Sequence, residues 1–101
     1  MKKIMLVCSA GMSTSLLVKK MQVAALDQGK QVEIFAIAES EVKNHTDVNA
    51  VLLGPQVRFL LGKITDMLAK NSIPVEVIGS VNYGTMNGDA VLKQAYEIMK
   101  E

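Results

Sequence analysis

Residues 4–18, with the sequence IMLVCSAGMSTSLLV, decide the fold because their pattern changes twice within a short stretch. The run from Ile4 to Val7 is continuously apolar and has strand length, as is typical of a strand buried on both faces of a parallel sheet. Cys8 closes this run, and a loop of small and hydroxyl-bearing residues follows it. Apolar residues then recur at helical spacing. The stretch therefore predicts a strand, a loop and a helix in succession.

The predicted helix has Ser13 or Thr14 as its N-cap and ends near Gly29. The unpaired N–H groups of its first turn, the amides of the loop and the positive end of the helix dipole together favour an anion of phosphate size. Cys8 faces this field, which makes it a candidate nucleophile for a phosphoryl group. The alternative is a buried cysteine that acts only as a small apolar side chain. The predicted phosphate-binding residues are Ser9, Ala10, Gly11, Met12, Ser13, Thr14 and Ser15.

The chain carries four segments, LVCSAGMSTSLLV (6–18), LLGPQV (52–57), VEVI (75–78) and YGTMNGDAVL (83–92), that together resemble one protein family. They are similar to the IIB components of the bacterial sugar phosphotransferase system, of the lactose, cellobiose and chitobiose type. Because the resemblance covers the whole chain, it implies a single IIB-like phosphoryl-carrier domain over residues 1–101.

The resemblance also implies a reaction and two partners. A histidine on a IIA partner phosphorylates Cys8, which then phosphorylates a sugar held by a membrane IIC partner. The implied sugar is a β-disaccharide such as cellobiose, chitobiose or lactose. A carrier of this kind is a cytoplasmic phosphotransferase.

Composition limits the other functions. The 101 residues suit one domain with a single core, and half of them are apolar. With 11 basic and 10 acidic side chains, the net charge of +1 gives no reason to expect nucleic acid or an anionic membrane as a partner. One cysteine and one histidine cannot form a disulfide or a zinc-like cluster, so we expect no metal, no cofactor and a reducing compartment. The apolar runs are too short for a signal peptide or a membrane span, so we expect a cytoplasmic protein.

The rest of the chain alternates between strand and helix patterns. Strands are predicted at residues 31–37, 50–53 and 73–78, and helices at residues 56–71 and after a loop at residues 79–88. Residues 38–45 are either a short exposed helix or a loop, and His45 there is a solvated connection residue. This alternation predicts a three-layer α/β sandwich, with a four-stranded parallel sheet in the order 2-1-3-4 and helices on both faces.

A sheet of this order binds ligands beyond the carboxyl ends of its strands, at the switch point between the first and third strands. Cys8 and residues 54–56 meet there, and Tyr83 follows the fourth strand at the same end. Residues 54–56 are either a routine turn or part of the site, and Tyr83 is either a partner contact or a loop anchor. The candidate partner contacts are Met12, Leu16, Pro55, Gln56 and Tyr83.

The loop after Cys8 is also similar to that of tyrosine phosphatases, and the predicted fold resembles their low-molecular-weight class. Their cysteine is followed, after five residues, by an arginine. In this chain Thr14 occupies that place, so the bidentate charge that stabilises the transferred phosphoryl group is missing. Asp89 is a candidate for the acid that a phosphatase needs, although its place at a helix start favours capping. The alternatives to a carrier are therefore a cysteine phosphatase and a non-catalytic flavodoxin-like binding module with an inert Cys8.

Overall fold

The protein is described from a computed structural model, which covers residues 1–8 and 12–101. Parallel strands form one sheet in the order β2-β1-β3-β4, which confirms the predicted order. The strands are β1 (Lys2–Cys8), β2 (Val32–Ala38), β3 (Ala50–Leu53) and β4 (Val75–Val77). The helices are α1 (Met12–Asp27), α2 (Leu61–Leu68), α3 (Ser80–Gly84) and α4 (Gly88–Met99), with short 3-10 helices η1 (Glu39–Asn44), η2 (Pro55–Leu60) and η3 (Ala69–Asn71).

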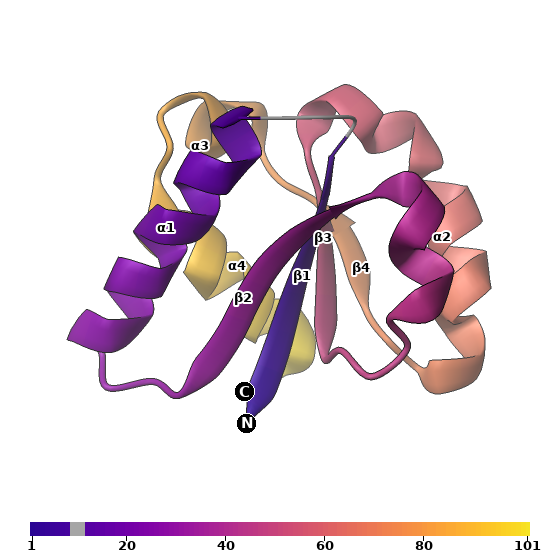
Figure 1. The fold of residues 1–101 in the computed structure, drawn as a ribbon, viewed down its shortest axis with the longest axis horizontal. Helices are drawn as coiled ribbons and strands as arrows, with labels where there is room; N and C mark the ends of the chain where they lie inside the picture. The colour runs from indigo at the N-terminus through magenta and orange to yellow at the C-terminus, as the bar shows by residue number, and fades with distance from the viewer. Residues whose placement is uncertain (9–11) are drawn as a thin grey trace.

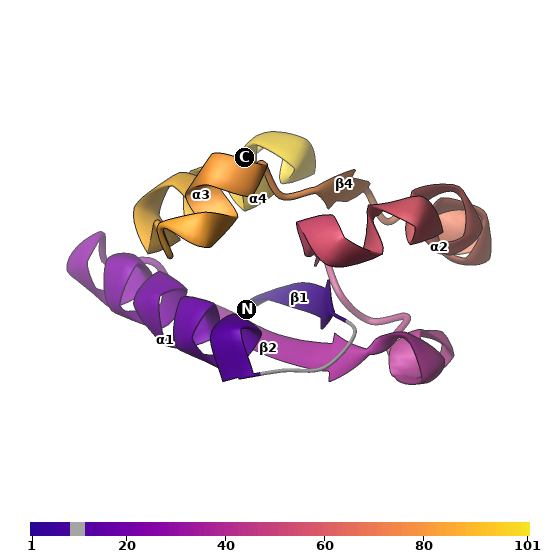
Figure 2. The same cartoon turned by 90° about the horizontal axis from the view of Figure 1, so that it is seen from above.

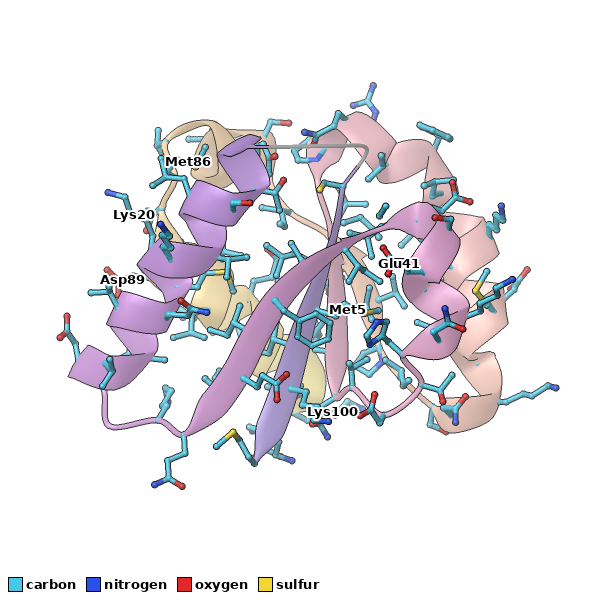
Figure 3. The ribbon with its side chains drawn as sticks, viewed as in Figure 1. Met5, Lys20, Glu41, Met86, Asp89 and Lys100 are labelled. Atoms are coloured by element: carbon cyan, nitrogen blue, oxygen red, sulfur yellow. The ribbon has the colours of Figure 1, made fainter. Side chains whose placement is uncertain are left out.

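Helices cover both faces of the sheet, as predicted for a three-layer sandwich (Figure 1). Seen from above, α1 and α4 lie on one side of the strands, and α2 lies on the other (Figure 2). Successive residues of β1 point to opposite faces, so the strand contributes to two separate cores. Ile4 and Leu6 pack with α1 and α4, whereas Met5 and Val7 pack with η1 and α2. Figure 3 shows Met5 on the side of the sheet that carries Glu41 of η1. All four side chains are fully buried, and β1 is therefore the central strand that joins the two cores.

The first helix begins earlier than predicted. Because α1 starts at Met12, Ser13 and Thr14 lie in its first turn and the prediction that either of them is the N-cap was wrong. The predicted end of the helix is confirmed: α1 ends at Asp27, and Gly29 follows it in the left-handed conformation, with φ of +68°.

The region around β4 also differs from the prediction. β4 is shorter than the predicted strand, although its pairing with β3 continues through hydrogen bonds from Val51 N–H to the Pro74 carbonyl and from Ile78 N–H to the Leu53 carbonyl. The predicted loop at residues 79–88 contains α3, because the N–H of Tyr83 donates to the Gly79 carbonyl at 2.9 Å and closes a helical turn. Asparagine and glycine are frequent in turns, and their number in this segment masked the helix.

Within residues 38–45, Glu39–Asn44 form the 3-10 helix η1, of which one residue, Val42, is fully buried. His45 follows η1 and is half-buried, with its ring centroid 5.3 Å from that of Phe35. His45 lies in a connection, as predicted, but it is only partly solvated, because η1 packs against β2 and brings the two rings together.

The amino end of the sheet carries both chain termini (Figure 1). Lys2 Nζ lies 3.2 Å from Glu101 Oε2, and Lys3 Nζ donates to Asp47 Oδ2 at 2.6 Å. The hydrogen bond between Lys3 and Asp47 lowers the pKa of the carboxyl group and raises the pKa of the amine. None of the helices in residues 1–8 and 12–101 combines the length and the apolar character that a membrane crossing requires.

Candidate functional site

Cys8 lies at the carboxyl end of the central strand. It is 6% exposed and pairs with Ala38, the last residue of β2. On the other side, the N–H of Gly54 donates to the Val7 carbonyl at 3.0 Å, so the turn after β3 begins beside the cysteine. The structure therefore brings Cys8 and the start of the turn at residues 54–56 together, as the sequence predicted from the switch point.

The N-terminus of α1 follows at the same end. A helix that begins at Met12 leaves the N–H groups of its first turn without acceptors inside the helix. The helix is 16 residues long, so the partial positive charge of its dipole adds to these N–H groups. The predicted phosphate-binding residues Ser9, Ala10 and Gly11 lie outside the described residues.

A pocket of about 310 Å³ lies beside Cys8. Its other lining residues come from the end of β2, from η1 and from η2, and are Ala38, Glu39, Ser40, Val57, Phe59 and Leu60. Glu39 and Phe59 were not among the site residues predicted from the sequence. In η2, which has about three residues per turn, Val57 and Leu60 share the buried side and Phe59 turns outward. The sequence predicted a regular α-helix from residue 56, and that pattern did not indicate that Phe59 is exposed beside Cys8.

Three polar side chains from separate elements meet at this end of the sheet. The hydroxyls of Thr14, in α1, and Tyr83, in α3, share a hydrogen bond of 2.8 Å. Gln56 Nε2, in η2, donates to the Tyr83 hydroxyl at 3.0 Å. Thr14 is only 2% exposed, whereas Gln56 is exposed. Tyr83 therefore connects the first turn of α1 to the turn that follows β3.

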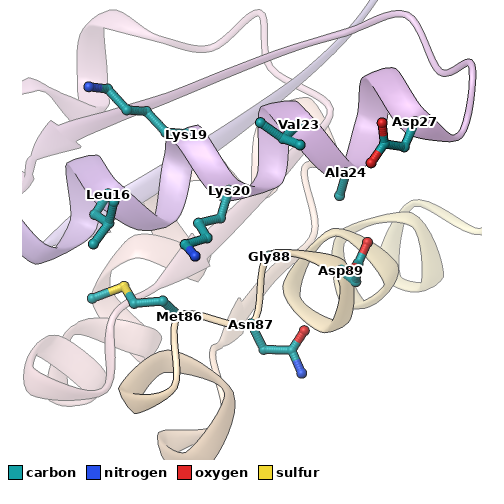
Figure 4. A pocket seen from close by; sticks show the side chains of 10 residues that line it. All are labelled: Leu16, Lys19, Lys20, Val23, Ala24, Asp27, Met86, Asn87, Gly88 and Asp89. Atoms are coloured by element: carbon teal, nitrogen blue, oxygen red, sulfur yellow. The ribbon is translucent and has the colours of Figure 1, made fainter.

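Leu16 lies on a different surface from the pocket beside Cys8. It is 48% exposed and lines a groove of about 490 Å³ between α1 and the segment that enters α4 (Figure 4). Lys20, Met86 and Asp89 line the same groove and lie on the α1 side of the molecule (Figure 3). The groove and the pocket beside Cys8 share no lining residue among the described part of the chain.

Asp89 does not cap α4. The cap is Asn87, whose Oδ1 accepts a hydrogen bond from the N–H of Ala90 at 3.1 Å. Asp89 lies in the first turn of α4, is exposed and accepts a hydrogen bond from Gln28 Nε2 at 3.5 Å. The expected capping role was wrong because the helix begins one residue earlier, at Gly88, and so places Asn87 at the cap.

Together, the fold and the site define a class of protein: a small doubly wound α/β domain with a cysteine between the end of its central strand and a helix N-terminus. The family model of the lactose/cellobiose-specific IIB subunits of the phosphotransferase system matches residues 3–94, and the chain belongs to this family. The resemblance noted in the sequence is confirmed. Components of this family are phosphotransferases, and this chain is a IIB component for sugar uptake of the lactose and cellobiose type.

Similar proteins come from several bacteria. The chain is 44% identical to the cellobiose-specific EIIB component of Lactococcus lactis subsp. lactis (strain IL1403), over 97% of this chain and 96% of the relative. It is 43% identical to the galactose-specific EIIB component of Lactococcus lactis subsp. cremoris (strain MG1363), with the same coverage. It is 42% identical to the oligo-beta-mannoside-specific EIIB component of Bacillus subtilis (strain 168), over 98% of this chain and 97% of the relative.

Solved structures show the same fold. The solution structure of the cellobiose-specific IIB component from Borrelia burgdorferi has a TM-score of 0.81 and 39% identity, covering 98% of this chain and 92% of that one. The lactose-specific IIB domain from Streptococcus pneumoniae has a TM-score of 0.85 over 96% of each chain. Its identity is 15%, so this second likeness concerns the fold alone.

Proposed function

We propose that the protein carries a phosphoryl group on Cys8, from a phosphohistidine of a IIA partner to a sugar held by a membrane IIC partner. The observation that supports this role is the place of Cys8, between the end of the central strand and the N-terminus of α1, in a family of phosphotransferases. In the first step the thiolate attacks phosphorus, the S–P bond forms and the N–P bond breaks to release imidazole. In the second step a sugar hydroxyl attacks phosphorus, the O–P bond forms and the S–P bond breaks, and the hydroxyl proton passes to the departing thiolate.

The amides of Ser9 to Ser15 hold the phosphoryl oxygens in this proposal. Those in the first turn of α1 point outward from the helix end, where the dipole also favours negative charge. The donors in the first turn of α1 are held by the helix before the reaction, so they stabilise the charge on the transferred group without reorganisation.

The pocket beside Cys8 favours a carrier over a phosphatase. Its described lining contains no arginine or lysine, and Thr14, at the place of the phosphatase arginine, directs its hydroxyl to Tyr83. Glu39 is the acidic residue in this lining, and its Oε2 accepts a hydrogen bond from Lys63 Nζ at 2.6 Å. Glu39 therefore directs its carboxylate toward Lys63, and the described lining holds no second acidic side chain that could protonate a leaving group. Water therefore receives little help in attacking the phosphocysteine.

The partners dock on apolar side chains around this end of the sheet. Phe59 lines the pocket beside Cys8 and is 77% exposed, Val81, in α3, is 77% exposed, and Leu16, on the neighbouring surface of α1, is 48% exposed. Exposed apolar side chains near a reactive group are typical of a surface that a partner covers. Met12, Pro55 and Gln56 are the further candidate contacts from the sequence, whereas for Tyr83 the sequence left both a partner contact and a loop anchor open.

Two of the three relatives, named for cellobiose and for oligo-beta-mannosides, support a β-linked disaccharide or oligosaccharide as the sugar, whereas the third is named for galactose. We infer that the protein works in the cytoplasm as one phosphoryl-carrier domain spanning residues 1–101.

The test is mass spectrometry of the intact chain after incubation with a phosphorylated IIA protein. We expect one added phosphoryl group, mapped by peptide analysis to Cys8 and missing from the Cys8→Ser variant. Phosphorylation at another residue, or none, would overturn the proposal.

A second measurement separates the carrier from the phosphatase. The phosphorylated chain should decay slowly by itself and rapidly with IIC and sugar, and it should not turn over an aryl phosphate. Fast unassisted decay with repeated aryl phosphate turnover would favour the phosphatase.

A further inference from the structure

We propose that Tyr83 is a positioning residue for phosphoryl transfer, whose hydroxyl fixes the first turn of α1 against the turn that follows β3. The inference rests on the function proposed above, because it assigns a task in that scheme to a residue to which the scheme gives none. It starts from two hydrogen bonds that join residues far apart in the sequence.

The hydroxyl of Tyr83 joins the two structures that flank Cys8. One of its bonds goes to Thr14, 69 positions away, and the other comes from Gln56, 27 positions away. Thr14 is the third residue of α1, so its side chain is attached to the helix turn whose amides are proposed to hold the phosphoryl oxygens. Gln56 belongs to the turn that begins at Gly54, whose N–H bonds to the strand that ends in Cys8.

The ring of Tyr83 is itself held in place. It packs against the apolar core between the sheet, α1 and α4. A Cβ atom built on Gly54 would lie 3.6 Å from Cε1 of Tyr83, so the ring lies directly over the turn after β3. A hydroxyl on a ring that is packed in this way has little freedom, and the bonds it makes define the distance between α1 and that turn.

Burial means that water cannot easily replace the hydrogen bond between Thr14 and Tyr83. Thr14 is 2% exposed, and a buried hydroxyl needs a protein partner because water cannot easily replace one. The first turn of α1 therefore has a preferred position, set by the Tyr83 hydroxyl. In-line transfer depends on donors placed within a fraction of an ångström, so a small shift of this turn reduces the rate far more than it reduces stability.

The test compares Tyr83→Phe with Tyr96→Phe in the full chain. Tyr83→Phe keeps the packed ring and removes only the hydroxyl. Tyr96→Phe removes the other tyrosine hydroxyl of the chain, on α4, where the ring lies 4.5 Å from Lys30 Nζ. Single-turnover transfer from a phosphorylated IIA is measured across IIA concentrations, together with thermal melting.

We expect the maximal transfer rate of Tyr83→Phe to fall on the order of a hundredfold, as for a misplaced catalytic group, with the KM for IIA little changed. The melting temperature should fall modestly, because the buried Thr14 hydroxyl loses its partner. Tyr96→Phe should match the wild type. Thr14→Ser, which keeps the hydroxyl, should retain most of the rate, whereas Thr14→Val should lose it. Because both residues act through one bond, the double variant Thr14→Val/Tyr83→Phe should be no slower than the slower single variant.

Several results would overturn the inference. Transfer by Tyr83→Phe within about twofold of the wild type would show that the hydroxyl has no positioning role. A higher KM with an unchanged maximal rate would make Tyr83 a partner contact instead. Losses that add in the double variant would indicate two independent structural roles. If the wild-type chain is not phosphorylated on Cys8, both the proposed function and this inference are wrong. If wild-type transfer is normal and the Tyr83 variants behave like the wild type, only the role of Tyr83 is wrong.

Discussion

At the amino end of the sheet, exposed ion pairs join the ends of the chain to their neighbours, whereas at the carboxyl end hydrogen-bonded side chains surround Cys8. The pairs Lys2–Glu101 and Lys3–Asp47 lie in solvent, where water and salt screen their attraction. At the other end, the buried Thr14 hydroxyl has a partner that water cannot easily replace. We therefore expect changes of charge at the amino end to have little effect on stability, whereas the proposed transfer at the carboxyl end depends on the placement of a few atoms.

The largest effect is expected at the carboxyl end, from Cys8→Ser. A serine hydroxyl is similar in size to the thiol but a much weaker nucleophile, so phosphoryl transfer from IIA should be lost while the chain stays folded. Single-turnover transfer and thermal melting would be measured side by side. Continued transfer by this variant would show that the acceptor is another residue.

Gly88→Ala tests how closely α4 approaches α1, the helix whose N-terminus lies beside Cys8. A Cβ on Gly88 would lie 2.6 Å from the carbonyl oxygen of Lys20, so α1 or α4 must move. We expect a loss of about 1–3 kcal/mol in the free energy of unfolding, measured by chemical denaturation.

The matched control for Gly88→Ala is Gly62→Ala in α2, where nothing lies within 4 Å of the added Cβ. This variant should be unchanged or more stable by up to about 1 kcal/mol, because alanine loses less backbone freedom on folding. Equal losses in the two variants would contradict the close approach of α4 to α1 at Gly88.

Phe59→Ala and Leu26→Ala compare exposed apolar side chains at the two ends. Phe59, beside Cys8, is 77% exposed, and Leu26, near the far end of α1, is 78% exposed. Both variants should change stability by less than about 0.5 kcal/mol. Only Phe59→Ala should raise the KM for IIA, by about fivefold to tenfold, since it removes a proposed partner contact. Equal KM values would place the docking surface elsewhere.

The smallest effect is expected at the amino end, from Asp47→Asn. Lys3 lowers the pKa of Asp47, so the pair contributes stability above the ordinary pKa of an aspartate and loses it as the pH falls through the lowered value. Lys3 has a raised pKa, so its contribution is present below the ordinary lysine pKa and is lost as the pH rises through the raised value. Melting of the wild type and the variant should differ slightly near neutral pH, and the difference should disappear in strong acid and in high salt. A large difference that salt does not reduce would contradict the screened, exposed pair.

The sequence by itself determined the sheet order, the layers and the place of Cys8. Buried parallel strands appear in the sequence as continuous apolar runs, such as Ile4 to Val7. In the helices between them, apolar residues recur every three to four positions. Right-handed crossovers then leave few ways to assemble four such strands, and they bring Cys8 and the turn at Gly54 to one edge. Each of these features is local or follows from a rule of connectivity.

Tertiary structure alone decided which side chains meet around that edge and which face solvent. No local pattern connects Thr14, Gln56 and Tyr83, because their contacts depend on where α1, η2 and α3 pack against the sheet. The exposure of Phe59 depends on η2 being a 3-10 helix, and α3 is hidden in the sequence by its turn-forming residues. Periodicity reports which face of one element is buried, whereas the distance between two elements is set by the packing of all the side chains between them.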